Sequence, residues 1–492
     1  MSQPTAPATS RTAIIETPDL GDRTYVVHDG QVAVVIDPQR DIDRVVATAG
    51  RLGVSVTHVL ETHLHNDYVS GGVALAQITG ADYLSHADEP VSHRRTGIRD
   101  GDAITTGGLT VRAIATPGHT LHHLSYVVEQ DGDIIGVFSG GSMLYGTVGR
   151  PDLVSSSMTR QLAFAQHASV RRLMSTLPPE APVYPTHGFG SLCAVSAMDR
   201  AQSTVGDERR DNPAARMAAE EFVDSTLSKL DAVPGYFRRM GPMNASMPPV
   251  VDLSPSPLVD GSDVRQRLGN GEWVIDVRPR AGFARRHLAG SLGFDASGPF
   301  GTYVAWLKPP DTPLVLIADD AAELSIARRR LERVAVNRPA AVAIAGRVLG
   351  DADAVTSYRR ATFAELLREA GDRPIQVVDV RGAVEWRRGH IAGAVHMPLH
   401  LLTSQAARLP RAELWVHCGT GHRSSIGASI LQRAGHDVTH IDDSLSNADF
   451  TQLAERLPQP EPSEPPLHHG HEGRAEAGTD VARPISVGVD HG

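Results

Sequence analysis

The C-terminal half of the chain contains an internal repeat, which limits how that half can fold. The segment WVIDVRPRAGFARRHLAGSLGF, from Trp273, matches QVVDVRGAVEWRRGHIAGAVHM, from Gln376. Self-similarity of this kind indicates two copies of one structural unit. Each copy spans about one hundred residues, a normal domain size. Strand-like and helix-like runs alternate in both copies, and this alternation predicts a parallel sheet covered by helices.

The whole chain of 492 residues is too long for one ordinary hydrophobic core, so several domains are expected. Residues 12–245 alternate strands, turns and helices, which predicts a layered α/β domain with a trailing helical segment. A Pro- and Ser-rich stretch from Gly241 is expected to be a linker. The two repeat copies are expected at residues 246–350 and 355–458, and residues 459–492 are expected to lack fixed structure.

The composition argues against several classes of function. The net charge of −10 gives no general attraction to nucleic acid or to an anionic membrane. No run approaches the roughly 18 apolar residues of a membrane span. The chain has only Cys193 and Cys418, which excludes a disulfide framework and favours a reducing cytoplasm. Cys193 has no basic neighbour in sequence, so a packing role is expected for it.

Cys418 follows an apolar strand-like run in LWVHCGTGHRSSIGASILQRAG. The turn after it contains Gly419 and Gly421, which let the backbone curl tightly. An amphipathic helix is expected to start near Ser424, and its N-terminus adds positive potential. Arg423 adds a fixed positive charge. Such a loop lowers the pKa of a thiol and stabilises an anionic sulfur, so Cys418 is predicted to be a nucleophile.

This second copy, with VVDVR, GHIAGAVHMP and CGTGHRS, resembles the rhodanese family of sulfurtransferases. The resemblance implies that Cys418 carries a persulfide, that Arg423 assists it, and that sulfane sulfur moves between a donor such as thiosulfate and an acceptor such as a thiol or sulfite. The implied binding residues are Gly419, Thr420, Gly421, His422 and Ser424. Tyrosine phosphatases also place an Arg after a Cys, with five residues between. Four residues separate the pair here, which favours a cradle for one sulfur atom.

The first copy of the repeat lacks this chemistry. Ala318 stands where the second copy has its cysteine, and Glu323 stands where the second copy has its arginine. Asp319 and Asp320 would repel an anionic sulfur. The first copy is therefore expected to be an inactive rhodanese-like domain that packs between the other two or shapes an interface.

Histidines recur after strand-like runs in residues 12–200. The stretch THLHNDYVSGG contains His63, His65 and Asp67 in His-x-His-x-Asp spacing. TPGHT contains His119, and YPTHG contains His187. Tight turns at strand ends can direct several side chains into one cleft, and neutral imidazoles are common ligands of zinc and iron. The set predicts a metal site.

The order and spacing of these motifs resemble the metallo-β-lactamase superfamily, which implies an αββα sandwich. VIDPQRD, ETHLHNDYVSG, TPGHT and GRPDL look like its persulfide dioxygenase branch, which is similar to glyoxalase II. That branch holds one Fe(II) through the first His of the motif, the TPGHT His and a later Asp. The resemblance implies His63 and His119 as ligands, with zinc as the alternative metal. It also implies O2 and a thiol persulfide, usually that of glutathione, as substrates and sulfite as the product.

One family ligand is missing. The later Asp would fall where this chain has Gly140-Gly141, and the resemblance implies a structural role for Asp152 in GRPDL. Gly141 has no side chain to bind a metal, so three alternatives stay open. His65 takes the place of the carboxylate ligand, Asp67 or a water molecule takes that place, or the site binds metal weakly or not at all. Tyr68 replaces the His that binds a second metal in two-metal members. It is expected either to offer a hydroxyl to substrate or to pack.

The sequence therefore predicts an α/β multidomain enzyme of sulfur metabolism, a persulfide dioxygenase coupled to a rhodanese. Two alternatives remain: an active rhodanese beside a non-catalytic, metal-poor domain, or a glyoxalase II-like thioester hydrolase. The expected partners are small molecules, with no nucleic acid or membrane. Family resemblance implies association into a homo-oligomer.

Overall fold

The computed structural model describes residues 11–196, 198, 200–248, 254–336, 338–372 and 375–457. The expectation for residues 459–492 lies outside this part of the chain. Within it, none of the helices combines the length and the apolar character needed to cross a membrane.

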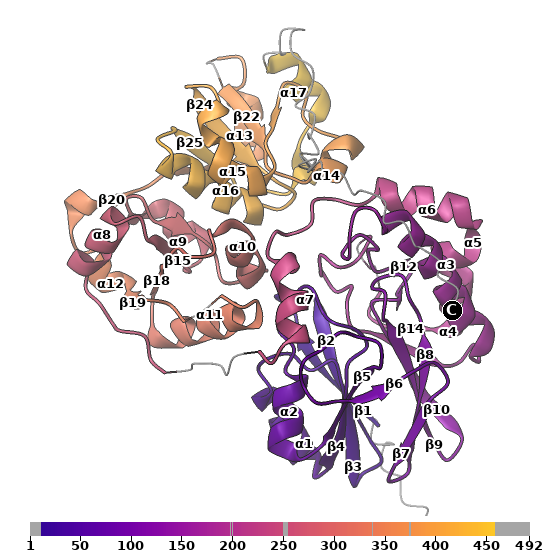
Figure 1. The fold of residues 1–492 in the computed structure, drawn as a ribbon. Coiled ribbons are helices and arrows are strands. Elements are labelled where there is room, and N and C mark those ends of the chain that lie inside the picture. The colour runs from indigo at the N-terminus through magenta and orange to yellow at the C-terminus, as the bar shows by residue number, and fades with distance from the viewer. Residues whose placement is uncertain are drawn as a thin grey trace, which may run out of the picture.

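Two six-stranded sheets packed face to face form the first domain (Figure 1). One sheet has the strand order β1 (Thr12–Thr17), β2 (Asp22–His28), β3 (Val32–Ile36), β4 (Ser55–Leu60), β5 (Asp82–His86) and β6 (Thr96–Ile98). The other has the order β14 (Ser203–Thr204), β13 (Pro182–Pro185), β10 (Asp133–Gly140), β9 (Leu124–Gln130), β8 (Leu109–Ala115) and β7 (Ala103–Thr106). Between the sheets, Val27 and Leu60 share one buried cluster with Val111 and Phe138.

Helices cover both outer faces of this pair of sheets. The first sheet is covered by α1 (Asp43–Leu52) and α2 (Gly72–Thr79), where Val45 and Leu75 pack in one cluster with Val35. The second sheet is covered by α3 (Thr159–Thr176), α4 (Val205–Asp211), α5 (Pro213–Arg216) and α6 (Ala219–Ser228), and β11 (Met143–Leu144) pairs with β12 (Thr147–Val148) beside them. The layer order helix, sheet, sheet, helix confirms the predicted αββα sandwich.

The trailing segment ends in α7 (Phe237–Ala245), which lies between the first domain and the repeat region in Figure 1. The linker predicted from Gly241 therefore begins inside a helix, and the expectation was wrong over its first residues. α7 continues through Pro242 because its apolar side chains Phe237 and Met240 are buried in the core. Burial of two large side chains outweighs the single backbone hydrogen bond that proline removes.

Each repeat copy forms its own parallel sheet, and the two sheets have the same strand order. The first copy, here called the second domain, has β17 (Leu292–Gly293), β15 (Trp273–Asp276), β18 (Leu314–Ala318) and β19 (Ala341–Ile344). The second copy, here called the third domain, has β23 (Val395–His396), β22 (Ile375–Asp379), β24 (Glu413–His417) and β25 (Val438–Ile441), with β21 (Arg359–Ala361) added at the edge. The ladders are parallel, as predicted.

Helices flank both of these sheets. Those of the second domain are α8 (Gly261–Gly269), α9 (Arg280–Arg285), α10 (Phe300–Leu307), α11 (Ala321–Arg333) and α12 (Ala345–Val348), with a short ribbon of β16 (His287–Leu288) and β20 (Val355–Thr356). Those of the third domain are α13 (Phe363–Glu369), α14 (Ala383–Arg388), α15 (Leu399–Gln405), α16 (His422–Arg433) and α17 (Phe450–Arg456).

The repeated Asp-Val-Arg motif has the same structural role in both copies. Arg278 Nη2 lies 2.6 Å from Asp276 Oδ2, and Arg381 Nη2 lies 2.6 Å from Asp379 Oδ2. Both pairs are buried at the end of the strand that precedes them. A buried, bidentate Asp–Arg pair fixes the direction of the chain as it leaves the sheet. The sequence repeat therefore reflects one local construction used twice.

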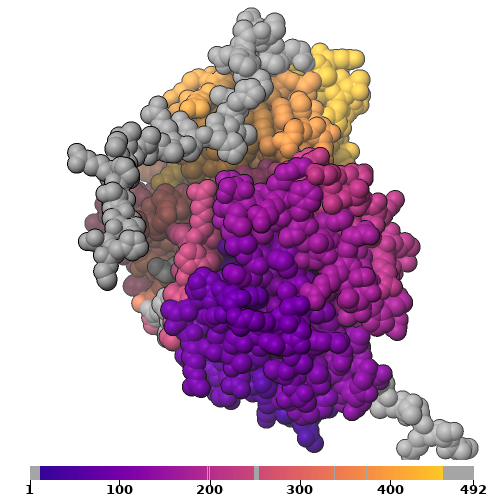
Figure 2. All heavy atoms as spheres, turned by 45° about the vertical axis from the view of Figure 1, so that its right-hand side comes forward, coloured from indigo at the N-terminus to yellow at the C-terminus, as the bar shows by residue number. Residues whose placement is uncertain are grey.

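The three domains share one hydrophobic cluster. It includes Val69 of the first domain, Tyr236 before α7, Phe300 of the second domain and Val380 of the third domain. The space-filling view shows the third domain, orange to yellow, seated directly on the first domain (Figure 2). The second domain thus packs against both of its neighbours, as the sequence suggested for the copy without a cysteine.

An ion cluster fastens the second domain to the first. Arg333, at the end of α11, donates to Asp19 Oδ1 and to Asp41 Oδ2, both at 2.7 Å. Its backbone carbonyl accepts from the Val69 amide at 2.7 Å. The side chains in this cluster are each less than 10% exposed, so water does little to stabilise their charges. Each charge is stabilised mainly by the opposite charge beside it. Removal of the cation would leave the buried Asp19 carboxylate with only the more distant Arg330, at 3.9 Å, while Asp41 would keep Arg44 at 2.7 Å.

Arg333→Met should therefore weaken the junction between the first and second domains, at a cost of about 3 to 5 kcal/mol. The measurement is thermal unfolding followed by calorimetry. Arg368→Met is the matched control, because the Arg368 side chain is 74% exposed and its nearest acidic partner lies 3.9 Å away. Equal midpoints for the two variants would contradict this account of the junction.

Candidate metal centre and cysteine loop

Three histidines converge at the ends of strands in the first domain. His63 follows β4, His119 follows β8 and His187 follows β13. All three are buried, and one ligand nitrogen from each lies within 4.8 Å of the other two. His63 Nε2 lies 3.3 Å from His187 Nε2. The two sheets bring together side chains that are far apart in sequence.

Each of these imidazoles is held through its Nδ1 atom. His63 Nδ1 lies 2.9 Å from Thr62 Oγ1, and His119 Nδ1 lies 2.9 Å from the Arg150 carbonyl oxygen. His187 Nδ1 lies 2.9 Å from Asp22 Oδ1. Hydroxyl, carbonyl and carboxylate partners of this kind fix the tautomer of a metal-binding histidine and leave Nε2 as the ligand atom.

The donor set fits a metal ion. His119 Nε2 is buried and has no hydrogen-bond partner among the described residues, although buried polar atoms normally have one. Burial and the neighbouring histidines lower the pKa of His63 and of His119, so both rings are neutral. Burial lowers the pKa of His187, but the Asp67 and Asp22 carboxylates raise it more, so the ring gains a proton. A metal ion that binds at Nε2 would have to displace this proton.

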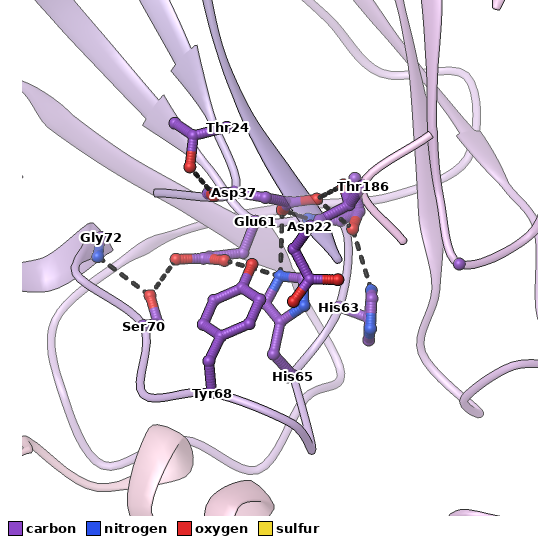
Figure 3. A network of polar contacts seen from close by, with 12 residues as sticks. Asp22, Thr24, Asp37, Glu61, His63, His65, Tyr68, Ser70, Gly72 and Thr186 are labelled. Carbon is purple, nitrogen blue, oxygen red and sulfur yellow. Dashed lines mark hydrogen bonds and ion pairs between the residues drawn. The ribbon is translucent and has the colours of Figure 1, made fainter. Parts of the chain in front are cut away.

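His65 lies in a different environment, shown in Figure 3. Its Nε2 is 3.2 Å from Asp37 Oδ1 and 3.2 Å from Glu61 Oε2. Burial opposes the charge, but these two carboxylates raise the pKa of His65 to about 9. His65 Nε2 thus faces two carboxylates, whereas the ligand nitrogen of His187 lies within 4.8 Å of those of His63 and His119.

Tyr68 is fully buried, with its ring stacked on His65 at a centroid distance of 4.4 Å. Asp67 lies beside His187, with Oδ2 3.3 Å from Nδ1, and accepts from the Ser191 hydroxyl at 3.2 Å. His65, Asp67 and His187 also have ligand atoms within 4.8 Å of one another. The charge of His65 and the engagement of Asp67 make this second group the poorer metal site.

Gly141 provides space for the His119 ring. A Cβ atom at residue 141 would lie 2.2 Å from His119 Cδ2 and 2.6 Å from His119 Nε2. The imidazole thus occupies the volume that a side chain at residue 141 would enter. The Gly141 amide donates to His123 Nε2 at 3.0 Å, and the His123 ring stacks on His63.

Sequence reasoning missed several residues that position this centre. They are Asp22, Asp37, Glu61, His123 and Arg150. Asp37 and Glu61 lie inside the motifs VIDPQRD and ETHLHND, and His123 closely follows TPGHT. The sequence therefore contained these residues in or next to its motifs, but it did not show which side chains they contact. Asp152 pairs with Arg150 at 2.6 Å and has the structural role that the resemblance implied.

The second site is the loop between β24 and α16. Cys418 is 2% exposed, and its Sγ accepts from the Gly421 amide at 3.2 Å and from the Ser424 hydroxyl at 3.5 Å. Gly421 has φ of 89°, a left-handed conformation that favours glycine. α16 begins at His422, two residues before the predicted start at Ser424. The helix N-terminus thus lies directly at the sulfur.

The other predicted loop residues surround this sulfur less closely. The Arg423 guanidinium lies beside Gly419, where a Cβ atom would be 3.7 Å from Nη2. Nη2 also donates to Glu385 Oε1 at 2.7 Å. Burial opposes the charge of Arg423, but Glu385 raises its pKa, so it stays a cation. Thr420 is exposed, and His422 turns toward Gly298 of the second domain.

The corresponding loop of the second domain is closed by carboxylates. Ala318 is buried at the end of β18. Asp320 accepts from the Glu323 amide at 2.9 Å, and Glu323 Oε2 accepts from the Asp319 amide at 3.0 Å. Acidic side chains therefore occupy several backbone amides of this loop, and their negative charge opposes an anionic sulfur.

Comparison with known proteins places both sites in families. A hydroxyacylglutathione hydrolase of Pseudomonas putida is 31% identical over 179 residues, which cover 33% of this chain and 69% of that protein. The mitochondrial persulfide dioxygenase ETHE1 of Bos taurus is 30% identical over 224 residues, 43% of this chain and 75% of that protein. A crystal structure of a metallo-β-lactamase from Staphylococcus aureus superimposes with a TM-score of 0.60 at 23% identity, over 68% of this chain and 99% of that one.

The chain belongs to the family that includes these hydroxyacylglutathione hydrolase and persulfide dioxygenase relatives, and it has the metallo-β-lactamase fold. The rhodanese-like domain family matches residues 362–448, which include Cys418 and Arg423. A metallo-β-lactamase sandwich and a rhodanese-like domain are therefore joined in one chain. The relatives of the sandwich include both a hydrolase and a dioxygenase, so the family alone does not choose the reaction.

Gly141→Ala should lower the affinity for metal by about tenfold or more, because the added methyl group displaces His119 from the other two histidines. The measurement is metal content by mass spectrometry after dialysis against a chelator of graded strength. Gly346→Ala, where a Cβ atom meets nothing within 4 Å, is the control and should keep the wild-type metal content. An unchanged affinity in Gly141→Ala would show that His119 does not bind the metal.

Proposed function

We propose that this protein oxidises the sulfane sulfur of a low-mass thiol persulfide to sulfite at the histidine centre. We also propose that it moves sulfane sulfur through Cys418. The observation that carries the proposal is that one chain joins a buried three-histidine centre to a cysteine whose sulfur accepts two hydrogen bonds in a rhodanese-like loop. Both chemistries act on the same form of sulfur, and a reducing cytoplasm suits them.

The proposed ligands are His63, His119 and His187, and Fe(II) is the proposed metal. Imidazole ligands suit iron as well as zinc, and iron supplies the activation of O2. The overall reaction is RSSH + O2 + H2O → RSH + sulfite + two protons. The sulfane sulfur loses four electrons, and O2 gains them.

Cys418 is the proposed carrier of the persulfide in the third domain. The Gly421 amide, the Ser424 hydroxyl and the Arg423 guanidinium stabilise its anionic sulfur. Thiosulfate or a thiol persulfide would supply the sulfane sulfur, and a thiol or sulfite would accept it. We further propose that the second domain is a rhodanese-like domain without a nucleophile.

A second candidate is a rhodanese beside a sandwich that does not oxidise sulfur. Gly141 favours it, because the third histidine replaces a carboxylate ligand of the dioxygenase relatives. A two-metal thioester hydrolase is less well supported, because His65 is charged and Tyr68 fills the space next to it.

Metal analysis of single variants tests the ligand set. His63→Ala, His119→Ala and His187→Ala should each lose the metal, whereas His65→Gln should retain most of it, since His65 is bound by Asp37 and Glu61. The wild-type protein should contain about one iron per chain and consume O2 with glutathione persulfide while sulfite accumulates. Two zinc ions with thioester turnover would refute the dioxygenase. An iron-free, inert centre would favour the second candidate.

Cys418→Ser should abolish the transfer of sulfur from thiosulfate to a thiol, without changing the metal content. Mass spectrometry of the wild-type protein after thiosulfate treatment should find the added sulfur on Cys418. The matched variant is Ala318→Cys in the Cys418→Ser background, which places a thiol at the equivalent position of the second domain. It should stay inactive because Asp320 and Glu323 occupy the loop amides. Appreciable activity would contradict the assignment of the second domain.

A further inference from the structure

A cavity of about 370 Å³ lies where the three domains meet. The first domain contributes Ser191 and Leu192, and the segment after α6 contributes Lys229. The second domain contributes Trp306 of α10, and the third domain contributes Arg388 and Arg423. The cavity therefore exists only because the domains pack as they do, and Arg423 connects its wall to the cysteine loop.

The same wall reaches the histidine centre. A smaller cavity of about 50 Å³ is lined by Asp67, and it shares Ser191, Leu192 and Tyr303 with the larger one. The Ser191 hydroxyl donates to Asp67 Oδ2 at 3.2 Å, and Asp67 lies beside His187. The wall that the two cavities share thus has Arg423 on one side and Asp67, the neighbour of His187, on the other.

The charges on the wall of the large cavity favour an anion. Glu385 is neutralised by Arg423, and the Asp231 carboxylate accepts from the Ala383 amide at 3.1 Å. The side chains of Lys229 and Arg388, which both line the cavity, have no hydrogen bond or ion pair with any described residue. Both cations are therefore available to a ligand, and Leu192 and Trp306 supply apolar surface beside them.

We infer that this cavity binds the anionic low-mass thiol that carries sulfur between Cys418 and the histidine centre. The ligand class is a small thiol with one or more carboxylates, held by Lys229 and Arg388. This inference rests on the proposed function. It adds that the carrier is held at the junction of the three domains, between Arg423 of the cysteine loop and the Ser191 wall next to Asp67, while it passes sulfur from one centre to the other.

The transfer step balances without an added oxidant. The carrier thiolate attacks the outer sulfur of the Cys418 persulfide. A new sulfur–sulfur bond forms on the carrier, the bond to Cys418 Sγ breaks, and Cys418 leaves as a thiolate that the Gly421 amide stabilises. The carrier persulfide then lies in the cavity whose wall leads to Asp67 and His187.

Calorimetric titration of the full-length Cys418→Ser protein with glutathione tests the binding site. Lys229→Glu and Arg388→Glu should each raise the dissociation constant about tenfold or more, because each reverses a charge facing the carboxylates. Arg411→Glu, an exposed charge reversal in the third domain outside the cavity, is the matched control and should leave it unchanged. Equal affinity in all three variants overturns the inference. So does glutathione binding no tighter than that of uncharged 2-mercaptoethanol.

An isotope-dilution experiment tests the internal transfer. Wild-type protein is loaded at Cys418 with isotopically labelled sulfane sulfur, then given O2, glutathione and an excess of unlabelled glutathione persulfide. The sulfite should carry more label than the bulk persulfide, and Leu192→Trp, which fills the shared wall, should bring it to the bulk level. Bulk-level label in the wild type refutes internal transfer. A protein that forms no sulfite contradicts the proposed function, whereas the calorimetric result still decides the binding site.

Discussion

The buried Arg150 is the residue on which both sites depend. Its backbone carbonyl accepts from His119 Nδ1 at 2.9 Å and so sets which nitrogen of His119 faces the other histidines. Its guanidinium pairs with Asp152 and donates to the Asp231 carbonyl at 2.6 Å. The Asp231 carboxylate in turn accepts amides at the start of α14, next to the Glu385 that holds Arg423. A shift of this one chain segment would disturb the histidine centre and the cysteine loop together.

Local sequence predicted the parts of each site that follow from a strand end. The cysteine loop was predicted from residues that are close in sequence, the alternation of strands and helices predicted the parallel sheets, and the family resemblance implied the αββα sandwich. His65 shows why the rest could not be predicted, because Asp37 belongs to another strand and only the packed sheet brings the two together. Gly141 likewise indicated a missing ligand in the sequence, whereas in the structure it provides the space that His119 fills.

The second domain explains how a copy without a nucleophile contributes to the molecule. Its α10 places Tyr303 and Trp306 on the wall of the junction cavity, and its α11 anchors the first domain through Arg333. Its loop carries carboxylates and therefore does not suit an anionic sulfur, but its sheet keeps the strand order of the third domain. The copy thus contacts both of its neighbours and helps to fix the distance between the histidine centre and the cysteine loop.

The replacement of a carboxylate by an imidazole changes the charge of the proposed metal centre. If His187 gives up its added proton on binding, three neutral imidazoles would leave a divalent ion more positive, by the charge of one carboxylate, than two imidazoles and an aspartate would. Coulomb attraction in a buried site would then favour an anionic ligand. Imidazoles are neutral ligands that a proton can displace, so the affinity for the ion would fall as the pH falls. The Asp22 and Asp67 carboxylates next to His187 Nδ1 offset part of this difference. Their negative charge makes the imidazole a more strongly donating ligand and lies close to the site.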